Sequence, residues 1–302
     1  MRWTYAGLSA GSDSPPEILP PAGAGRLARV RTELKSHPNL AFGGTLAALV
    51  VAVAVVGRLA PPDNPLAINA GHALASPGPG RWFGTDQFGR DVLSRVLYGI
   101  GIDVLIGLTV AALALIAGSL VGLVSGYLGG WLDDIVMRVV DIVMSFPSFL
   151  LALSIAVVLG NTLPNVVVAV TIAYVPYILR LTRSSVLSVR SADYVLGARA
   201  VGASRARVMV LHVLPNAAGA SVVQATLMSG WAILDVSGLS FLGVGIQPPS
   251  PELGVQVAQG ASYITSGQWW VSVFPGVAII LAVLAFNFLG DYADDKLRGQ
   301  GS

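Results

Sequence analysis

The stretch LYGIGIDVLIGLTVAALALIAGSLVGLVSG, residues 97–126, contains a single charged side chain, Asp103, among residues that are mostly apolar or small. A helix needs about 20 predominantly apolar residues to cross the hydrocarbon core of a bilayer. This run is long enough to do so. It predicts a membrane-spanning helix, and it is the first sign of an all-α membrane protein.

The rest of the chain has the same character. Hydrophobic residues make up 54% of the sequence and charged residues 11%, against roughly 25% charged residues in a soluble domain. The same length criterion predicts five further spans, at residues 39–58, 134–160, 164–187, 217–236 and 272–290. The apolar stretch 234–246 carries several glycines and ends in two prolines, which favours a bend or re-entrant piece over a seventh span. We therefore expect a polytopic protein with six transmembrane helices.

The distribution of basic residues predicts the orientation of these helices. Only Arg58, Arg81, Arg90 and Arg95 fall on one side of the six predicted spans, and all other lysines and arginines fall on the side of the termini. Positive residues gather on the cytosolic side of membrane proteins, so both termini are predicted to be cytosolic. The predicted regions are a cytosolic tail (1–38), the first helix with an extracytoplasmic segment (39–96), a core of five helices (97–292) with an internal loop at 188–216, and a C-terminal cytosolic tail (293–302).

Three glycines in the second predicted span recur every four residues, at Gly118, Gly122 and Gly126. This spacing places them on one helix face, where another helix backbone can approach closely. Packing within the chain is the favoured interpretation, and a seam between two chains is the alternative.

Acidic residues inside predicted spans are candidates for function, because a charge in lipid is costly unless it is paired or hydrated. Asp103, Asp141 and Asp235 are in this position. Arg138 precedes Asp141 by three residues and shares its helix face, which predicts an ion pair in preference to a proton relay. Asp235 lies at the outer end of its span and is expected to be solvated.

Several kinds of chemistry have no support in the sequence. The chain has no cysteine, neither Lys35 nor Lys296 lies in a phosphate-binding loop, and no metalloprotease or serine-hydrolase motif occurs. The net charge of +2 is explained by arginines that flank membrane helices, so no nucleic-acid partner is predicted. We expect a non-enzymatic chain that binds no cofactor and no metal ion.

The internal loop has the signals of a helix, a turn and a second helix. Ser191 is the predicted N-cap of the first helix, Gly202 its end, Ser204 the cap of the second helix and Pro215 its break at the membrane. A short helix pair held between two spans is suited to transmitting movement to a protein below the membrane. An ordinary amphipathic connection is the alternative.

The residues of this loop closely resemble the signature of binding-protein-dependent ABC importer permeases, E-Y-V-x-A-A-R-x-x-G-A-S followed by H-x-L-P-N. The residues that fit are Asp193, Tyr194, Val195, Ala198, Arg199, Gly202, Ala203, Ser204, His212, Leu214, Pro215 and Asn216. Two positions differ conservatively, with Asp193 in place of Glu and Gly197 in place of Ala. In that family the loop docks into a groove of a separate ATPase subunit. The resemblance implies that Asp193, Tyr194, Ala198, Arg199, Gly202, Ala203, Ser204 and Arg205 form an ATPase-coupling loop.

Three further stretches are similar to the C-type permease of dipeptide, oligopeptide and nickel importers. The first has Gly84, Thr85, Asp86, Gly89, Arg90, Asp91, Ser94 and Arg95. The second is Leu239–Gly243, continued by Gln247, Pro248 and Pro249, and the third runs from Trp269 and Trp270 to Asp291. Val236 departs from the family, which usually has a glutamate there. We expect the first stretch to order the entry to the second span.

The resemblance implies a type I ABC importer permease fold in a bacterial plasma (inner) membrane. It implies four kinds of partner: a homologous B-type permease, two ATPase subunits or one fused ATPase, an extracytoplasmic solute-binding protein, and membrane lipids. ATP and Mg would be bound by the ATPases, and the imported solute would be a dipeptide or oligopeptide. The residues of the substrate path are not identified.

Three alternatives stay open at this point. The chain could import nickel or another small solute within the same family, although the absence of cysteine weighs against a metal path. It could be a secondary transporter that uses Asp141 or Asp103 for ion coupling. It could also be a membrane scaffold that uses the glycine face only to bind other helices.

Overall fold

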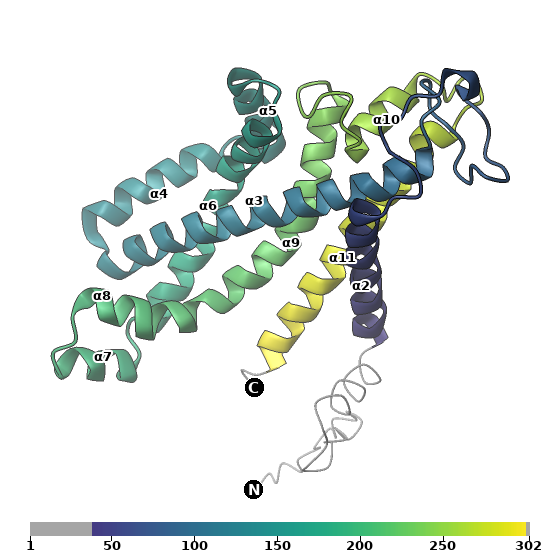
Figure 1. Ribbon diagram of the computed structural model, residues 1–302. Coiled ribbons are helices and arrows are strands. Elements are labelled where there is room, and N and C mark those ends of the chain that lie inside the picture. Colours follow the sequence, from purple (N-terminus) through teal and green to yellow (C-terminus); the bar gives the residue numbers. More distant parts are fainter. Residues whose placement is uncertain (1–37, 300–302) are drawn as a thin grey trace, which may run out of the picture.

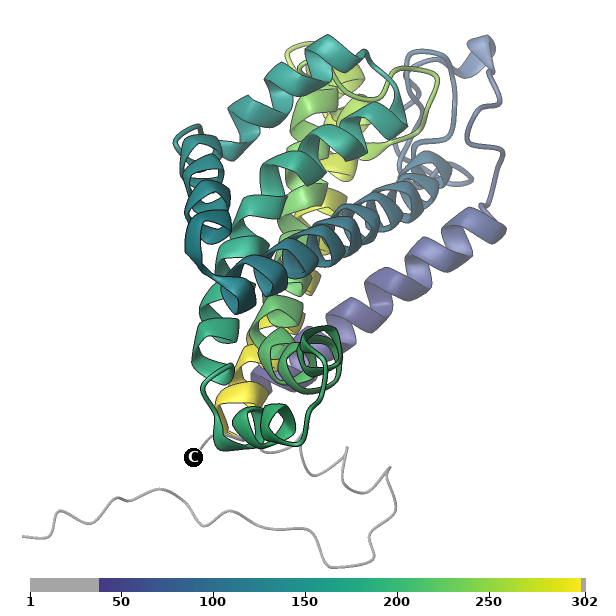
Figure 2. The ribbon, with the colours of Figure 1, turned by 90° about the vertical axis from the view of Figure 1, so that its left-hand side faces the viewer.

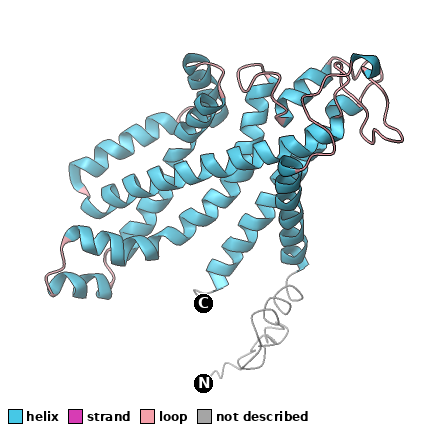
Figure 3. Cartoon of the chain, in the orientation of Figure 1, coloured by secondary structure: helices cyan, strands magenta, loops and turns pink. Residues whose placement is uncertain are grey.

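The computed structural model describes residues 38–299, and within that range it consists of helices and connecting loops without a β-strand (Figure 3). Nearly all of the predicted tail 1–38 and the last residues, 300–302, lie outside the described part. The predicted C-terminal tail begins inside a helix, because α11 (Trp270–Gly299) continues through Gly299.

Long apolar helices form the body of the protein. Besides α11 they are α2 (Pro38–Leu59), α3 (Val92–Leu128), α6 (Leu163–Val189) and α9 (Leu214–Phe241). Four described helical stretches are long and apolar enough to cross a membrane: Val92–Leu128, Leu163–Val189, Arg205–Phe241 and Trp270–Lys296. The apolar part of α2, Gly43–Leu59, is shorter than these four helical stretches.

The predicted span 134–160 is broken. Helix α4 (Gly130–Met144) and helix α5 (Ser148–Leu159) are bent by 90° relative to each other, so the span predicted as one helix consists of two. The cause is local: Pro147 is the N-cap of α5, and a proline disfavours helical geometry at the residue before it. If the bent pair is counted as one span, the structure has five candidate spans among its described residues.

Helix ends follow the chemistry of the sequence. The side chain of Asp91 caps α3 by accepting the Ser94 N–H at 2.8 Å, and α3 ends at Gly129, which has a φ of +66°. Pro164 lies in the first turn of α6, where no intrahelical N–H bond is lost. The stretch 234–246 adds no further helix: α9 ends at Phe241, and Gly243 (φ +77°) forms the turn that follows.

Helix α3 crosses the body of the protein and packs against α2, α6 and α9 (Figure 1). One apolar core lies among α3, α5, α6 and α9, and a second lies among α2, α3, α9, α10 (Leu253–Ala261) and α11. The start of α2, the end of α11 and the short helices α7 and α8 lie toward one end of the molecule, called the α7–α8 end below. The short helix η1 (Ala70–His72) and α10 lie toward the opposite end, called the α10 end (Figures 1 and 2).

Candidate functional site

The predicted coupling loop folds as two short helices, α7 (Asp193–Ala200) and α8 (Arg205–Val208). Gly202 lies in the turn between them with a φ of +87°, a conformation that L side chains adopt only with strain. Ser204 caps α8 and accepts the Arg207 N–H at 3.4 Å. The N-cap of α7 is Ala192, so the expectation that Ser191 caps this helix was wrong; the Ser191 hydroxyl bonds the Ser188 carbonyl instead.

Pro215 was expected to end the second helix of the loop, and this expectation was also wrong. Pro215 lies in the first turn of α9, and helix α8 runs through a π-helical turn, Met209–Val213, directly into α9. Pro215 has no N–H to donate to the preceding turn, and the π-helical turn directly before it accommodates the missing bond, so the chain stays helical. The loop is therefore joined to a long apolar helix without a flexible break.

One face of the helix pair is fixed to the body of the protein. Val195 and Val208 are fully buried in a cluster with residues of α3, α6 and α9, among them Tyr127. The Arg199 guanidinium lies over the Tyr127 ring, 5.4 Å from its centroid. The opposite face is open: Tyr194 is 49% exposed and Val201 85%. Asp193, Gly202, Ser204 and Arg205 are also exposed, as is part of Arg199 beyond its contact with Tyr127, while Ala198 and Ala203 are partly buried.

At the α10 end, the stretch 84–95 forms a second polar cluster around Asp86. Oδ1 of Asp86 accepts the N–H groups of Phe88 (2.9 Å) and Arg90 (3.0 Å), and Oδ2 binds the Arg90 Nε at 2.6 Å and lies 3.5 Å from the Arg95 Nε. Asp86, Arg90 and Arg95 are almost completely buried. The Asp86 carboxylate thus holds two arginines and its own loop in place.

The neighbouring residues complete this turn structure. The Thr85 hydroxyl donates to the His72 carbonyl and accepts the Ala75 N–H at 2.8 Å. Gly84 and Gly89 have positive φ angles, and a Cβ on Gly89 would overlap the Asn69 carbonyl. The predicted motif residues from Gly84 to Arg95 therefore lie together, and Asp91 and Ser94 form the capping turn of α3.

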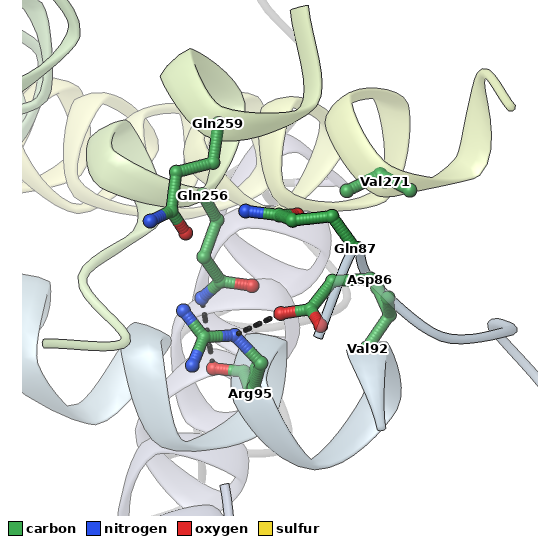
Figure 4. Close-up of a pocket in the computed structure, with 7 residues that line it drawn as sticks. All are labelled: Asp86, Gln87, Val92, Arg95, Gln256, Gln259 and Val271. Carbon is green, nitrogen blue, oxygen red and sulfur yellow. Dashed lines mark hydrogen bonds and ion pairs between the residues drawn. The ribbon is translucent and has the colours of Figure 1, made fainter. Parts of the chain in front are cut away.

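Distant parts of the chain also bind this cluster (Figure 4). The Gln256 Nε2 donates to the Arg95 carbonyl at 3.0 Å, the Arg90 Nη2 donates to the Gln259 Oε1 at 3.3 Å, and the Trp270 indole donates to the Thr85 carbonyl at 3.1 Å. Sequence reasoning did not identify Gln256 or Gln259 as part of the site. They lie 161 and 169 residues from their partners, and no local pattern reports such a contact.

The glycine face of α3 lies against α6. A Cβ on Gly118 would meet Ile178, one on Gly122 would meet the Leu179 carbonyl, and one on Gly126 would meet Val186. The close approach of α3 and α6 depends on these missing side chains.

The acidic residues of the predicted spans have unexpected partners. Asp141 pairs with Arg180 of α6, whereas Arg138, its expected partner, is exposed and makes no ion pair with a described residue. The Tyr174 hydroxyl donates to Asp235 at 2.9 Å, so Asp235 is partly buried and bonded where a solvated side chain was expected. Asp103 is 2% exposed. Among the described residues, no three His, Cys, Asp or Glu side chains are grouped as a metal site would require.

The chain is similar in sequence to known proteins of one family. The model of the family described as "Binding-protein-dependent transport system inner membrane component" matches residues 118–299. A dipeptide transport system permease protein, DppC, of Alkalihalophilus pseudofirmus is 38% identical, over 88% of this chain and 87% of that protein. A probable D,D-dipeptide transport system permease protein, DdpC, of Escherichia coli is 40% identical, over 87% and 88% respectively. A glutathione transport system permease protein, GsiD, of Pectobacterium atrosepticum is 35% identical, over 88% of each chain.

Proposed function

The chain belongs to the family of binding-protein-dependent transport system inner membrane components, and on that premise we propose that it is the transmembrane permease subunit of an ATP-driven peptide importer. The observation that carries the proposal is the α7–α8 pair, which is anchored on one face, exposed on the other and continuous with α9. The peptide substrate rests on the relatives, because those for dipeptides, D,D-dipeptides and glutathione all share most of their length with this chain.

The α7–α8 pair is the proposed docking element for an ATPase subunit. Its exposed Tyr194 and Val201 supply apolar contact area, and Arg205 and Arg207 supply positive charge on the same loop. Because Val195 and Val208 are buried in the body, movement of the docked ATPase would carry α9 with it. In this mechanism ATP and Mg are bound by the ATPase subunits, and the chain described here contributes no catalytic residue.

The orientation of the helices and the positions of the other partners follow from a cytosolic α7–α8 pair. Counting α2 and the bent α4–α5 pair each as a span gives six, with the α7–α8 end cytosolic and the α10 end extracytoplasmic in a bacterial plasma membrane. The start of α2 and the end of α11 both lie toward the α7–α8 end, which supports cytosolic termini (Figure 2). A homologous B-type permease would complete the substrate path, and a solute-binding protein would deliver peptide at the α10 end. Nucleotide-driven closure of the ATPases would rock the two permeases between inward-facing and outward-facing states.

The test is purification of the chain together with the products of its neighbouring genes, followed by ATPase and peptide-uptake assays in vesicles. Gly202→Val places a β-branched side chain at a φ of +87° and should reduce peptide-stimulated ATPase activity at least tenfold. Gly197→Ala is the matched control: it lies on α7 with no atom near an added Cβ, and it should keep normal activity.

The same vesicles separate this proposal from its rivals. An importer requires ATP inside and transports the peptide that its binding protein holds. Uptake that continues without ATPase subunits would establish a secondary transporter in its place. Uptake of nickel without uptake of peptide would contradict the proposed peptide substrate, and the chain would still be a permease.

A further inference from the structure

Two buried carboxyl groups meet at the α10 end, and neither is explained by the transport mechanism. Asp103 on α3 is 2% exposed, and its carboxyl oxygens make no hydrogen bond of normal geometry with the described residues, although the Leu253 N–H and the Ser237 hydroxyl face them. Glu252 is fully buried and is the N-cap of α10, where its carboxyl oxygens accept the N–H groups of Gly254 (3.0 Å) and Val255 (2.8 Å). Unpartnered buried oxygens of this kind are rare in folded proteins and call for an explanation.

The two groups are brought together by close packing of α3, α9 and α10. A Cβ on Gly99, one turn before Asp103, would overlap the carbonyl of Pro251 beside Glu252. A Cβ on Gly254 would likewise overlap Ser237 of α9. The Asp103 and Glu252 carboxyl groups interact electrostatically, and the Ser237 hydroxyl faces both of them.

Within residues 38–299, no basic side chain is paired with either carboxyl group. On α3, Arg95 is turned toward Asp86 and the Pro65 carbonyl, and on α2, Arg58 lies over the Tyr98 ring. On α9, Asp235 is bonded to Tyr174 of α6. Helix α10 has no charged residue of its own, and the charged residues of α11 lie in its last turns, from Asp291 onward, toward the α7–α8 end.

Two anionic carboxylates cannot both remain charged at close range in a buried site without a cation, because desolvation and mutual repulsion oppose it. Consistent with this, burial raises the pKa of the Glu252 carboxyl, against the opposing effect of its two backbone N–H partners. A bound proton removes one charge and turns one acceptor oxygen into an O–H donor, which the neighbouring carboxylate can accept.

We propose that Asp103 and Glu252 together bind one proton in the folded protein, and that this proton fastens α10 to α3 and α9. The site binds the proton as a structural ligand and passes it nowhere, since the neighbouring polar groups, Ser237 and Ser240, are themselves buried. The proposal concerns the chain alone and does not depend on the identity of the transported solute.

Infrared spectroscopy of the full chain in lipid nanodiscs at pH 7 tests the proposal directly. The difference spectrum between wild type and Asp103→Asn should contain the carbonyl stretch of a protonated carboxylic acid, present in wild type and lost in the variant. Glu252 alone, bonded to two N–H groups at a helix N-terminus, should then be ionised. Asp141→Asn is the matched control, because the Asp141 side chain is 62% exposed and pairs with Arg180; its spectrum should keep the band. A wild-type minus Asp103→Asn spectrum with only the ionised carboxylate band would overturn the proposal.

Thermal unfolding against pH is the second measurement. The folded protein keeps a proton that the unfolded chain releases above about pH 4, so the contribution of this pair to stability is greatest at low pH and falls as the pH rises. Between pH 5 and the pH at which the pair releases its proton, the folding equilibrium of wild type should weaken about tenfold per pH unit relative to Asp103→Asn. Identical pH dependence in the two proteins would contradict the proposal. If Asp103→Asn does not fold, Asp103→Ser removes the carboxyl with a smaller side chain and serves in both measurements.

Discussion

Arg183 on α6 holds Asp133 on α4 through two hydrogen bonds, Nε to Oδ1 at 2.6 Å and Nη2 to Oδ2 at 2.5 Å. The Asp133 side chain is 10% exposed and that of Arg183 is 26% exposed. Helix α4 buries only two of its residues, Asp133 and Val140, so this bidentate pair is a principal link between α4 and the body of the protein.

We predict that Arg183→Lys lowers the free energy of unfolding by about 1–3 kcal/mol, because a lysine cannot form the two parallel bonds. Thermal unfolding of the purified chain in detergent measures the change. Arg180→Lys is the control, with an expected loss of about 0.2–1 kcal/mol, because Arg180 and Asp141 are both well exposed. Equal losses in the two variants would show that the Arg183–Asp133 pair does not hold α4.

Close packing of α3 on α6 gives the second prediction. Gly122→Ala places a Cβ 2.6 Å from the Leu179 carbonyl, which should force the helices apart and cost about 1–3 kcal/mol of stability. Gly276→Ala on α11 meets no atom within 4 Å and should be neutral or stabilising by up to about 1 kcal/mol. The melting temperatures of the two variants, compared with wild type, measure these changes. A Gly122→Ala protein as stable as wild type would argue against tight α3–α6 packing.

The exposed face of the α7–α8 pair gives the third prediction. Tyr194→Ala and Val201→Ser should weaken binding of the ATPase subunit at least tenfold and leave the melting temperature of the isolated chain unchanged, because both side chains are exposed in it. Val195→Ser should have the opposite signature, a loss of about 1–3 kcal/mol in stability, because Val195 is fully buried. Pull-down of the ATPase and a melting curve distinguish the two effects.

The Asp86 cluster gives the fourth prediction. Asp86→Asn leaves the buried Arg90 and Arg95 without a counter-charge and should cost about 3–5 kcal/mol of stability. Asp63→Asn, on an exposed residue of the same segment, should cost less than about 0.5 kcal/mol. Protease digestion of the 61–95 segment would report the same difference, with faster cleavage in Asp86→Asn only. Equal protection of both variants would contradict the proposed role of Asp86.

Local patterns predicted a large part of this architecture. The apolar runs located the long helices, and the signals at Gly202 and Ser204 located the turn and cap of the α7–α8 pair, because these depend on residues within one or two turns of each other. Glu252 was missed because glutamate is not a usual N-cap residue; the available signal was that an acidic group is favourable near the N-terminus of a helix. The loop motif also pointed to the family that the comparisons show.

The sequence by itself determined that this chain is a helical membrane protein with a helix–turn–helix loop at α7–α8, since composition, helix length and turn chemistry act locally. Only the tertiary structure decided that Asp141 pairs with Arg180 and that Asp103 lies near Glu252, whereas the break between α4 and α5 has a local cause at Pro147. The physical reason is that residues three or four apart share a helix face in any helix, whereas a partner on another helix depends on how those helices pack. Arg138 was near Asp141 along its own helix, and the packing of α4 on α6 brought Arg180 to it instead.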